Sequence, residues 1–296
     1  MVLGLVALPF ASLCADEGAS FLKIGVGARA AGLGAAQTAV ADDASAIYWN
    51  PAGLSGIGKS ELAAHHAELF ADTRYDFLAM SRPTRIGTIG AGFGYLSQGA
   101  IEGRDENRNP TGNFTASDAV FGLALARRVS TSVQAGIGLK AIQSRIAGDS
   151  ASTAALDIGA IWKASPMSVG VAVQNLGPGL KFVNERSQLP LTFAGGVALR
   201  LPLGLALAAD ARYRPYSRSQ EYGIGTEYGG LGAITFRAGW LGARTQGGTA
   251  SKARSVIPVG FAAGIGLRFS SFNLDYSFVP FGELGNAQRI SLSSRF

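Results

Sequence analysis

The sequence is poor in the side chains on which disulfides and most metal sites depend. Its 296 residues include one cysteine and two histidines. Cys14 lies in an apolar N-terminal run that resembles a leader, so the mature chain would hold no cysteine, which excludes disulfides and thiolate metal sites. His65 and His66 are adjacent on a predicted strand and would point to opposite faces, which excludes a joint metal site. We expect no metal and no cofactor.

Charged residues and long apolar runs are also scarce. Charged residues make up 16% and hydrophobic residues 47% of the chain, with a mean hydropathy of +0.21. No uncharged apolar run of about 18 residues follows the first fifteen, which excludes a helical membrane protein. A chain this apolar must therefore spread its apolar residues thinly, as alternating strands do.

Clusters of basic residues are missing, although the chain is basic overall. The net charge is +6 and the isoelectric point is about 9.6. Lysines and arginines come singly, so the basic stripe of a nucleic-acid-binding surface is absent and we expect no nucleic-acid partner.

The first residues are typical of a secretory signal. An apolar run over 1–10 is followed by small residues up to Ala15, and Asp16 and Glu17 come next, which predicts a signal peptide over 1–15. A lipoprotein is the alternative because of Cys14, but Leu13 before it is not a small residue. Export across the inner membrane is the better-supported prediction.

Alternation of apolar with small or polar residues runs from about Ser60 to the end. Near the C-terminus, Phe272, Leu274, Tyr276 and Phe278 would share one face of a strand. The same pattern predicts fourteen strands, at 60–67, 74–82, 87–97, 117–128, 131–145, 152–163, 167–175, 190–201, 204–214, 219–229, 233–243, 257–269, 271–281 and 287–296.

The connections between these strands provide an independent test. The third (98–116), seventh (176–189) and eleventh (244–256) are long, whereas the even-numbered ones are tight. Bacterial outer-membrane barrels have an even strand number, short periplasmic turns and longer outer loops. We therefore predict an all-β, antiparallel transmembrane barrel over 59–296, located in the cell outer membrane of a diderm bacterium with outer-membrane lipid as a partner.

The polar face of these strands must line the interior. In lipid every backbone polar group needs a partner, so spanning strands must close on themselves, and a lipid-facing arginine at the midplane would cost about 2–4 kcal/mol. Two interpretations of these charges are open: they only hold the lumen together, or they guide a substrate. The predicted lumen-facing charges are Asp157, Arg200, Asp210, Arg212, Glu227, Arg237, Arg268, Asp275, Arg289 and Arg295.

Aromatic residues near strand ends support the same fold. The last strand alternates and closes on Phe296, which looks like the signal read by the outer-membrane barrel assembly machinery, an expected partner. A girdle of aromatic residues is typical of such barrels. The candidates for it are Trp162, Tyr213, Tyr228, Trp240 and Phe269.

The segment 16–58 differs from the rest of the chain. It is rich in glycine and alanine, and Asp42 and Asp43 could cap a short helix that begins near Ala44. Pro51 would end this helix, because the residue before a proline avoids the α region. A dinucleotide-binding loop is excluded, since no βαβ unit follows the glycines. We predict a compact hatch that plugs the barrel.

Several stretches of the mature chain resemble one family. They are 21–32, 41–54, 70–76, 173–178, 189–193 and 275–285, and they are similar to the PorV/PorQ family of outer-membrane proteins, which is in turn similar to FadL-type long-chain fatty-acid channels. The resemblance implies a fourteen-stranded barrel with an N-terminal hatch that carries an Asn-Pro-Ala motif. It places Asn50, Pro51, Ala52 and Gly53 in that hatch.

The resemblance implies passive uptake of a hydrophobic small molecule as the first functional hypothesis. FadL-like channels release their ligand through a side door at a kink in the third strand. Here the third predicted strand holds Gly87, Gly90, Gly92 and Gly94, which would permit such a kink.

The second hypothesis is a protein-interaction role. PorV-like barrels escort secreted cargo proteins in bacteria with type IX secretion, and the charged connection from Glu102 to Ser117 could bind a partner. An enzyme is the third hypothesis and the weakest, because no serine with a histidine and a carboxylate in reach is indicated.

Overall fold

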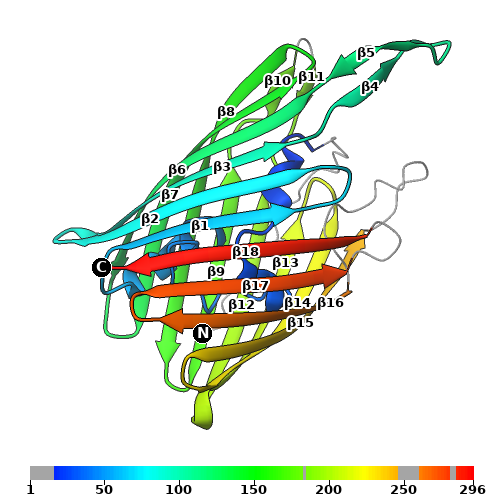
Figure 1. Cartoon of the computed structure of the whole chain (residues 1–296). Helices are drawn as coiled ribbons and strands as arrows, with labels where there is room; N and C mark the ends of the chain where they lie inside the picture. Colours follow the sequence, from blue (N-terminus) through cyan, green and yellow to red (C-terminus); the bar gives the residue numbers. More distant parts are fainter. Residues whose placement is uncertain (1–16, 183–184, 246–259, 281–284) are drawn as a thin grey trace.

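A computed structural model describes residues 17–182, 185–245, 260–280 and 285–296, and fourteen of its strands close an antiparallel barrel (Figure 1). The closing pair joins the first strand to the last, with Glu61 opposite Arg295 and Glu68 opposite Gln288. The predicted fold is therefore confirmed; the predicted signal peptide, 1–15, lies outside the described residues. The barrel strands are β1 (Glu61–Glu68), β2 (Arg74–Thr84), β3 (Gly87–Ser97), β6 (Ala116–Arg128), β7 (Val133–Ile146), β8 (Asp149–Ala164), β9 (Met167–Leu176), β12 (Thr192–Leu201), β13 (Leu205–Arg214), β14 (Ser219–Leu231), β15 (Ile234–Thr245), β16 (Gly260–Phe269), β17 (Phe272–Pro280) and β18 (Asn286–Arg295).

One end of the barrel carries only tight turns. The turns at this end follow β2, β6, β8, β12, β14 and β16, and the chain ends there too, where Phe296 N donates to Ser60 O. The turn after β12 is a 3-10 turn, η3 (Pro202–Gly204). This odd–even rule is the one that the sequence predicted, and we call this end the turn end and the opposite one the loop end.

Two connections at the loop end are more ordered than the sequence predicted. Both were expected as plain loops, but each holds a two-stranded hairpin: β4 (Ile101–Arg104) with β5 (Pro110–Phe114), and β10 (Leu180–Phe182) with β11 (Glu185–Ser187). The β4–β5 hairpin projects beyond the barrel in Figure 1. The predicted eleventh connection falls mainly outside the described residues.

The period of two along the strands separates an apolar outer face from an inner face of small and polar residues. In β7, Ile137 and Leu139 face outward and are 47% and 65% exposed, whereas Lys140 and Ile142, which follow them, are buried inside. The proposed girdle residues also face outward, and Trp162 and Phe269 are 43% and 58% exposed. An outer face this apolar requires an apolar environment.

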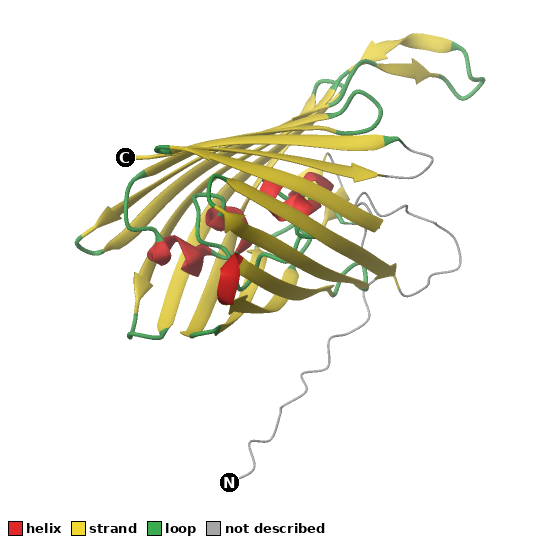
Figure 2. Cartoon of the chain, turned by 60° about the horizontal axis from the view of Figure 1, so that its bottom comes forward, coloured by secondary structure: helices red, strands yellow, loops and turns green. Residues whose placement is uncertain are grey.

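The segment before β1 lies within the barrel (Figure 2). It forms η1 (Ser20–Lys23), α1 (Ala28–Gly32), α2 (Ala46–Trp49) and η2 (Pro51–Gly56). α1 packs against β15 to β18, and η2 packs against β3, β6, β7 and β8. We call residues 17–58 the hatch. Among the described residues, no helix has the length and apolarity to cross a membrane.

Candidate functional site: the barrel interior and its hatch

Asn50 joins the hatch to the barrel wall. It caps the end of α2 and is fully buried, and its Oδ1 accepts Ala52 N at 3.1 Å. Its Nδ2 donates to Thr38 O at 2.8 Å and to Ala160 O and Val171 O at 3.3 Å. Ala160 and Val171 face each other across β8 and β9. One side chain therefore links two hatch segments to one strand pair.

The helix that Asn50 ends is close to the predicted one. α2 begins at Ala46, two positions after the predicted start, and Asp43 Oδ1 accepts Ser45 N at 2.9 Å just before it. Asp42, the other predicted capping residue, forms ion pairs instead, with Arg29 at 2.5 Å and Arg200 at 2.9 Å. Burial of Asp42 favours its neutral form, but the charges of Arg29 and Arg200 and the hydrogen bond from Arg29 together outweigh this, so the pKa of Asp42 lies below its ordinary value.

Glycines on the inner wall let the hatch approach the strands closely. A Cβ at Gly136 would lie 2.5 Å from Pro51 C, and one at Gly159 would overlap Asn50 Oδ1. On the other side of the barrel, a Cβ at Gly225 or Gly239 would overlap the backbone of Leu33 or Gly34. We call six such positions the glycine seat, because only a residue without a Cβ permits this contact: Gly136, Gly159, Gly170, Gly223, Gly225 and Gly239.

A bulge in β9 turns two consecutive side chains toward the lumen. The register with β8 shifts between Leu156 and Ile158, and Gln174 and Asn175 are both buried. An extra residue in one strand re-aims side chains in this way. Gln174 Nε2 donates to the carbonyls of Tyr48 and Trp49 at 2.6 and 2.9 Å, so the bulge holds the end of α2.

The second residue of the bulge belongs to a buried polar group. Asn175 N donates to Asp157 Oδ1 at 2.8 Å, and Asn175 Oδ1 accepts Lys140 Nζ at 2.9 Å. Lys140 also pairs with Asp157 at 2.6 Å. Asp157 therefore neutralises the charge of Lys140, and its carboxylate accepts the backbone N–H of Asn175 where the bulge interrupts the β8–β9 pairing. The sequence predicted that Asp157 faces the lumen but not that Lys140 and the bulge surround it.

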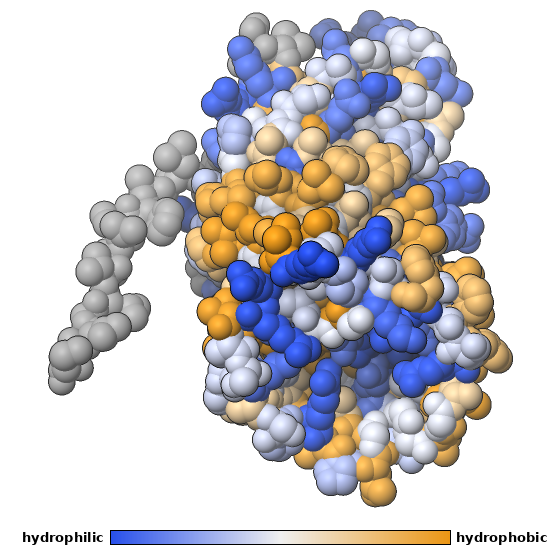
Figure 3. Space-filling model, turned by 90° about the vertical axis from the view of Figure 1, so that its left-hand side faces the viewer, coloured by the Kyte–Doolittle hydropathy of each residue, from blue (hydrophilic) through white to orange (hydrophobic). Residues whose placement is uncertain are grey.

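A polar vestibule of about 330 Å³ lies at the turn end, below the hatch. One of its ion pairs links the hatch to the wall, Arg29 to Glu227 at 2.9 Å. Within the wall, Arg237 pairs with Glu227 at 2.7 Å and with Asp275 at 2.6 Å. Figure 3 views the molecule from this side, and hydrophilic residues gather in the middle of the face between apolar ones. The predicted lumen charges among its lining residues are Arg200, Glu227, Arg237, Arg268, Asp275 and Arg295.

Asp210 and Arg212, two of the other predicted lumen charges, bind a different part of the hatch. Asp210 Oδ2 accepts Gln37 N at 2.9 Å and Thr38 N at 2.8 Å, and it also pairs with Arg212 at 2.9 Å. Arg212 lies over the Trp49 ring, 4.8 Å from its centroid. A cation in this position is attracted by the negative face of the ring.

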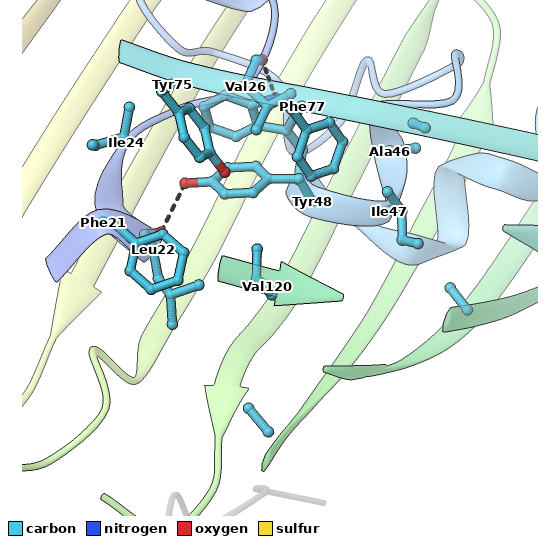
Figure 4. Close-up of a cluster of buried hydrophobic side chains, with 14 of the residues drawn as sticks. Phe21, Leu22, Ile24, Val26, Ala46, Ile47, Tyr48, Tyr75, Phe77 and Val120 are labelled. Atoms are coloured by element: carbon cyan, nitrogen blue, oxygen red, sulfur yellow. Dashed lines mark hydrogen bonds between the residues drawn. The ribbon is translucent and has the colours of Figure 1, made fainter. Parts of the chain in front are cut away.

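A smaller, mainly apolar cavity of about 50 Å³ lies on the loop-end side of the hatch. Its hatch wall includes Leu22, Ile24, Tyr48 and Trp49, which Figure 4 shows in part, with Tyr75 and Phe77 of β2 close to Tyr48. Burial raises the pKa of Tyr48 to about 12, so its hydroxyl stays protonated and donates to Leu22 O at 2.9 Å. This cavity therefore lies between the hatch and the barrel wall, on the side that faces the loop end.

The glycines of β3 lie against the hatch and β2. A Cβ at Gly90 would lie 2.7 Å from Leu54, and one at Gly92 would lie 3.2 Å from Ile47 and 3.0 Å from Phe77. Gly94 has Tyr75 and Val120 as neighbours, and Gly87 has a positive φ of 139° at the start of the strand. β3 pairs with β2 and β6 without a register shift. The side door there stays a prediction.

The two histidines point to opposite faces of β1. His65 Nδ1 is 2.8 Å from Ser291 Oγ inside the barrel, whereas His66 Nδ1 is 2.7 Å from Asp76 Oδ1 outside. No group of three or more potential metal ligands occurs in the described parts of the chain. In the β4–β5 hairpin, hydrogen bonds from Asn109 and Asn107 lower the pKa of the exposed Asp105.

The comparisons with known proteins concern the fold. A model of an uncharacterised protein family, UPF0164, matches residues 15–114. The search of curated proteins finds no match. Among solved structures, the Pseudomonas putida toluene transporter TodX aligns with a TM-score of 0.66 and 14% identity, over 96% of this chain and 98% of that chain.

Two further solved structures are similar to the same extent. A Pseudomonas aeruginosa FadL homologue aligns with a TM-score of 0.66 and 13% identity, over 92% of this chain and 98% of that one. The CymD monoaromatic hydrocarbon channel aligns with a TM-score of 0.64 and 14% identity, over 92% and 98%. The similarity of the fold to FadL-type channels is thereby confirmed, and the PorV/PorQ assignment stays a prediction.

Proposed function

We propose that the protein is a passive outer-membrane channel for hydrophobic small molecules. The observation that carries the proposal is a closed barrel with an apolar outer face and an apolar cavity between its hatch and its loop end. The names of similar structures, a toluene transporter and a monoaromatic hydrocarbon channel, support it. Passage needs no chemistry, only favourable contacts along a path.

Binding of toluene to the purified, detergent-solubilised chain tests the proposal. Ala262 lines the apolar cavity and is buried, so Ala262→Phe should fill the cavity and weaken toluene binding at least several-fold. Ala141→Phe is the matched control, because Ala141 is exposed on the outer face of β7. Wild-type protein in the outer membrane should also accelerate uptake of labelled toluene by cells. No binding by folded protein and unchanged uptake would refute the channel.

A disulfide across β2 and β3 tests whether the ligand leaves sideways. Met80 and Ala91 are partners in this strand pair, so Met80→Cys with Ala91→Cys would cross-link the proposed side door. Leu267→Cys with Leu274→Cys places the control cross-link between β16 and β17. Uptake that falls only with the first cross-link, and recovers on reduction, supports the side door. Equal uptake in both indicates a path past the hatch.

The β4–β5 hairpin favours a second candidate function, the binding of a secreted cargo protein. It projects beyond the barrel, and Glu102, Arg104, Asp105 and Arg108 are exposed or half-exposed on it. Replacement of 101–114 by a glycine-serine linker should abolish cargo capture and leave toluene binding intact. Type IX secretion components encoded in the same genome would favour this candidate, and their absence would disfavour it.

The terminal Phe296 is proposed as the assembly signal. Its side chain is 68% exposed, so it contributes little to the packing of the described barrel. Deletion of Phe296 should lower the amount of barrel in the outer membrane without lowering the stability of protein refolded in detergent.

A further inference from the structure

Arg289 is a buried cation without a carboxylate partner. It lies on the inner face of β18 and is 6% exposed, and its Nη1 donates to Gly25 O in the hatch. None of the described aspartates or glutamates forms an ion pair with it, although the other interior arginines on the loop-end side, Arg212 and Arg214, each have one. A buried charge without a counter-charge costs several kcal/mol, and an ionisable side chain at membrane depth indicates a functional site.

The polar groups around Arg289 also lack partners. Its own Nε, Tyr75 Oη, Ser277 Oγ and His65 Nε2 are buried and form no hydrogen bond. They lie on adjacent strands: Arg289 faces Ser277 across β17 and Ala67 across β1, and Ala67 faces Tyr75 across β2. We call His65, Tyr75, Ser277 and Arg289 the donor cluster.

Apart from the hydrogen that Arg289 Nη1 donates to Gly25 O, the donor cluster has donors for which the described residues provide no acceptor. The Arg289 guanidinium, the Tyr75 hydroxyl and the Ser277 hydroxyl are donors. Ser291 Oγ lies 2.8 Å from His65 Nδ1. If this hydroxyl donates to Nδ1, the Nε2 of His65 carries the hydrogen and becomes a fourth donor. A group of buried donors with one net positive charge is complementary to an anion.

The cluster borders the apolar cavity on the loop-end side of the hatch. Arg289 lines that cavity of about 50 Å³ and also a space of about 10 Å³ beside His65 and Tyr75. Figure 4 shows Tyr75 directed toward Tyr48 of the cavity wall. Among the described lining residues the only carboxylate is Glu221, which Arg214 engages with both its terminal nitrogens. An anionic head group at Arg289 would therefore continue into an apolar body in the cavity.

We propose that the donor cluster binds the carboxylate of a small organic acid whose short apolar body occupies the adjacent cavity. The inference rests on the proposed function in so far as the ligand must enter the barrel, and it narrows the ligand class. Because one water needs about 10–15 Å³, a cavity of about 50 Å³ holds a body of a few carbons as it stands, and a body as large as toluene requires the hatch to move.

Butyrate and butyramide provide a matched test on the full chain folded in detergent. They have the same shape, but only butyrate is an anion at pH 7.5. Calorimetric titration should show that butyrate binds at least tenfold more tightly than butyramide. Arg289→Gln should weaken butyrate binding roughly 10- to 100-fold, as expected for loss of a charge-assisted hydrogen bond, and leave butyramide unchanged. Arg289→Lys should restore part of the affinity, and Tyr75→Phe should weaken butyrate binding several-fold.

Three controls separate the outcomes. Arg145→Gln removes an exposed arginine of β7 and should leave butyrate binding unchanged, and heat-modifiable migration on a gel reports whether each variant is folded. Equal binding of butyrate and butyramide, or unchanged butyrate binding in folded Arg289→Gln, would overturn the proposal. Chloride that competes for the site as strongly as butyrate would also overturn the proposal, because the apolar body would then contribute nothing to binding. If toluene binds and butyrate does not, the anion site is refuted and the proposed channel is not. If butyrate binds in a way that depends on Arg289 and toluene does not bind, only the proposed passage of neutral molecules is refuted.

Discussion

At the scale of single residues, Asn50 shows how much one buried amide can hold. Its Nδ2 is the hydrogen-bond donor for carbonyls of Thr38, Ala160 and Val171, and the bond to Thr38 is buried. The sequence suggests a helix end at Asn50 because Pro51 follows it. The partners in β8 and β9 are more than a hundred positions away, so local rules do not identify them.

Asn50→Ala should therefore loosen the hatch without opening the barrel. Each buried carbonyl left without a partner costs about 1–3 kcal/mol. We expect faster proteolysis within the hatch and larger ion conductance in planar bilayers, with an unchanged heat-modifiable barrel. Asn107→Ala, in the exposed β4–β5 hairpin, is the control and should change neither measurement. A hatch in Asn50→Ala that stays as protease-resistant as that of the wild type contradicts this role.

Asp42 makes the attachment of the hatch dependent on pH. Its folded pKa is lower than its ordinary value because Arg29 and Arg200 together outweigh the effect of burial, so its stabilising contribution is complete above the unfolded pKa of about 4. The contribution is lost as the pH falls through the still lower folded pKa. The protection of hatch amides against hydrogen exchange, relative to the intrinsic exchange rate at each pH, should therefore fall below about pH 4 in the wild type.

Asp42→Asn is the matched variant for this pH dependence. It should show faster exchange already at pH 7, because the ion pairs with Arg29 and Arg200 are gone, and a weaker further change on acidification. If the variant and the wild type respond to acid alike, the ion pairs of Asp42 do not control the hatch.

At the scale of elements, the glycine seat determines how closely the hatch approaches the strands. The high glycine content predicts turns and close backbone approach, but it does not say which glycines serve which purpose. The structure shows that backbone meets backbone at Gly225 and Gly239, whereas Gly195 faces open space. Only the docked position of the hatch distinguishes these sites.

Gly239→Ala should therefore displace the hatch, whereas Gly195→Ala should be tolerated. A Cβ at Gly239 would overlap the backbone at Leu33 and Gly34, and overpacking of this kind costs about 1–3 kcal/mol. Urea unfolding in detergent and proteolysis of the hatch measure the effect. Equal unfolding midpoints for the two variants would show that the hatch yields freely at this contact.

At the scale of the whole molecule, the outer face determines the environment that the barrel requires. Leu139 near the middle of β7 is 65% exposed and has no protein partner on that side. Leu139→Arg should destabilise the barrel in lipid vesicles by about 2–4 kcal/mol, measured by urea titration of the folded fraction. Thr111→Arg in the β4–β5 hairpin should have little effect. A Leu139→Arg variant that folds as stably in vesicles as the wild type would argue against lipid at this face.

The sequence alone determined the strands, their number and which side chains face outward, because alternation is a local property with a period of two. It also separated the hatch from the barrel, since segment 16–58 lacks that period. It did not indicate the β9 bulge, the glycine seat or the donor cluster. These depend on register and docking between distant segments: Arg289 and Gly25 are 264 positions apart. Only closure of the barrel around the hatch decides which buried donors find an acceptor and which do not.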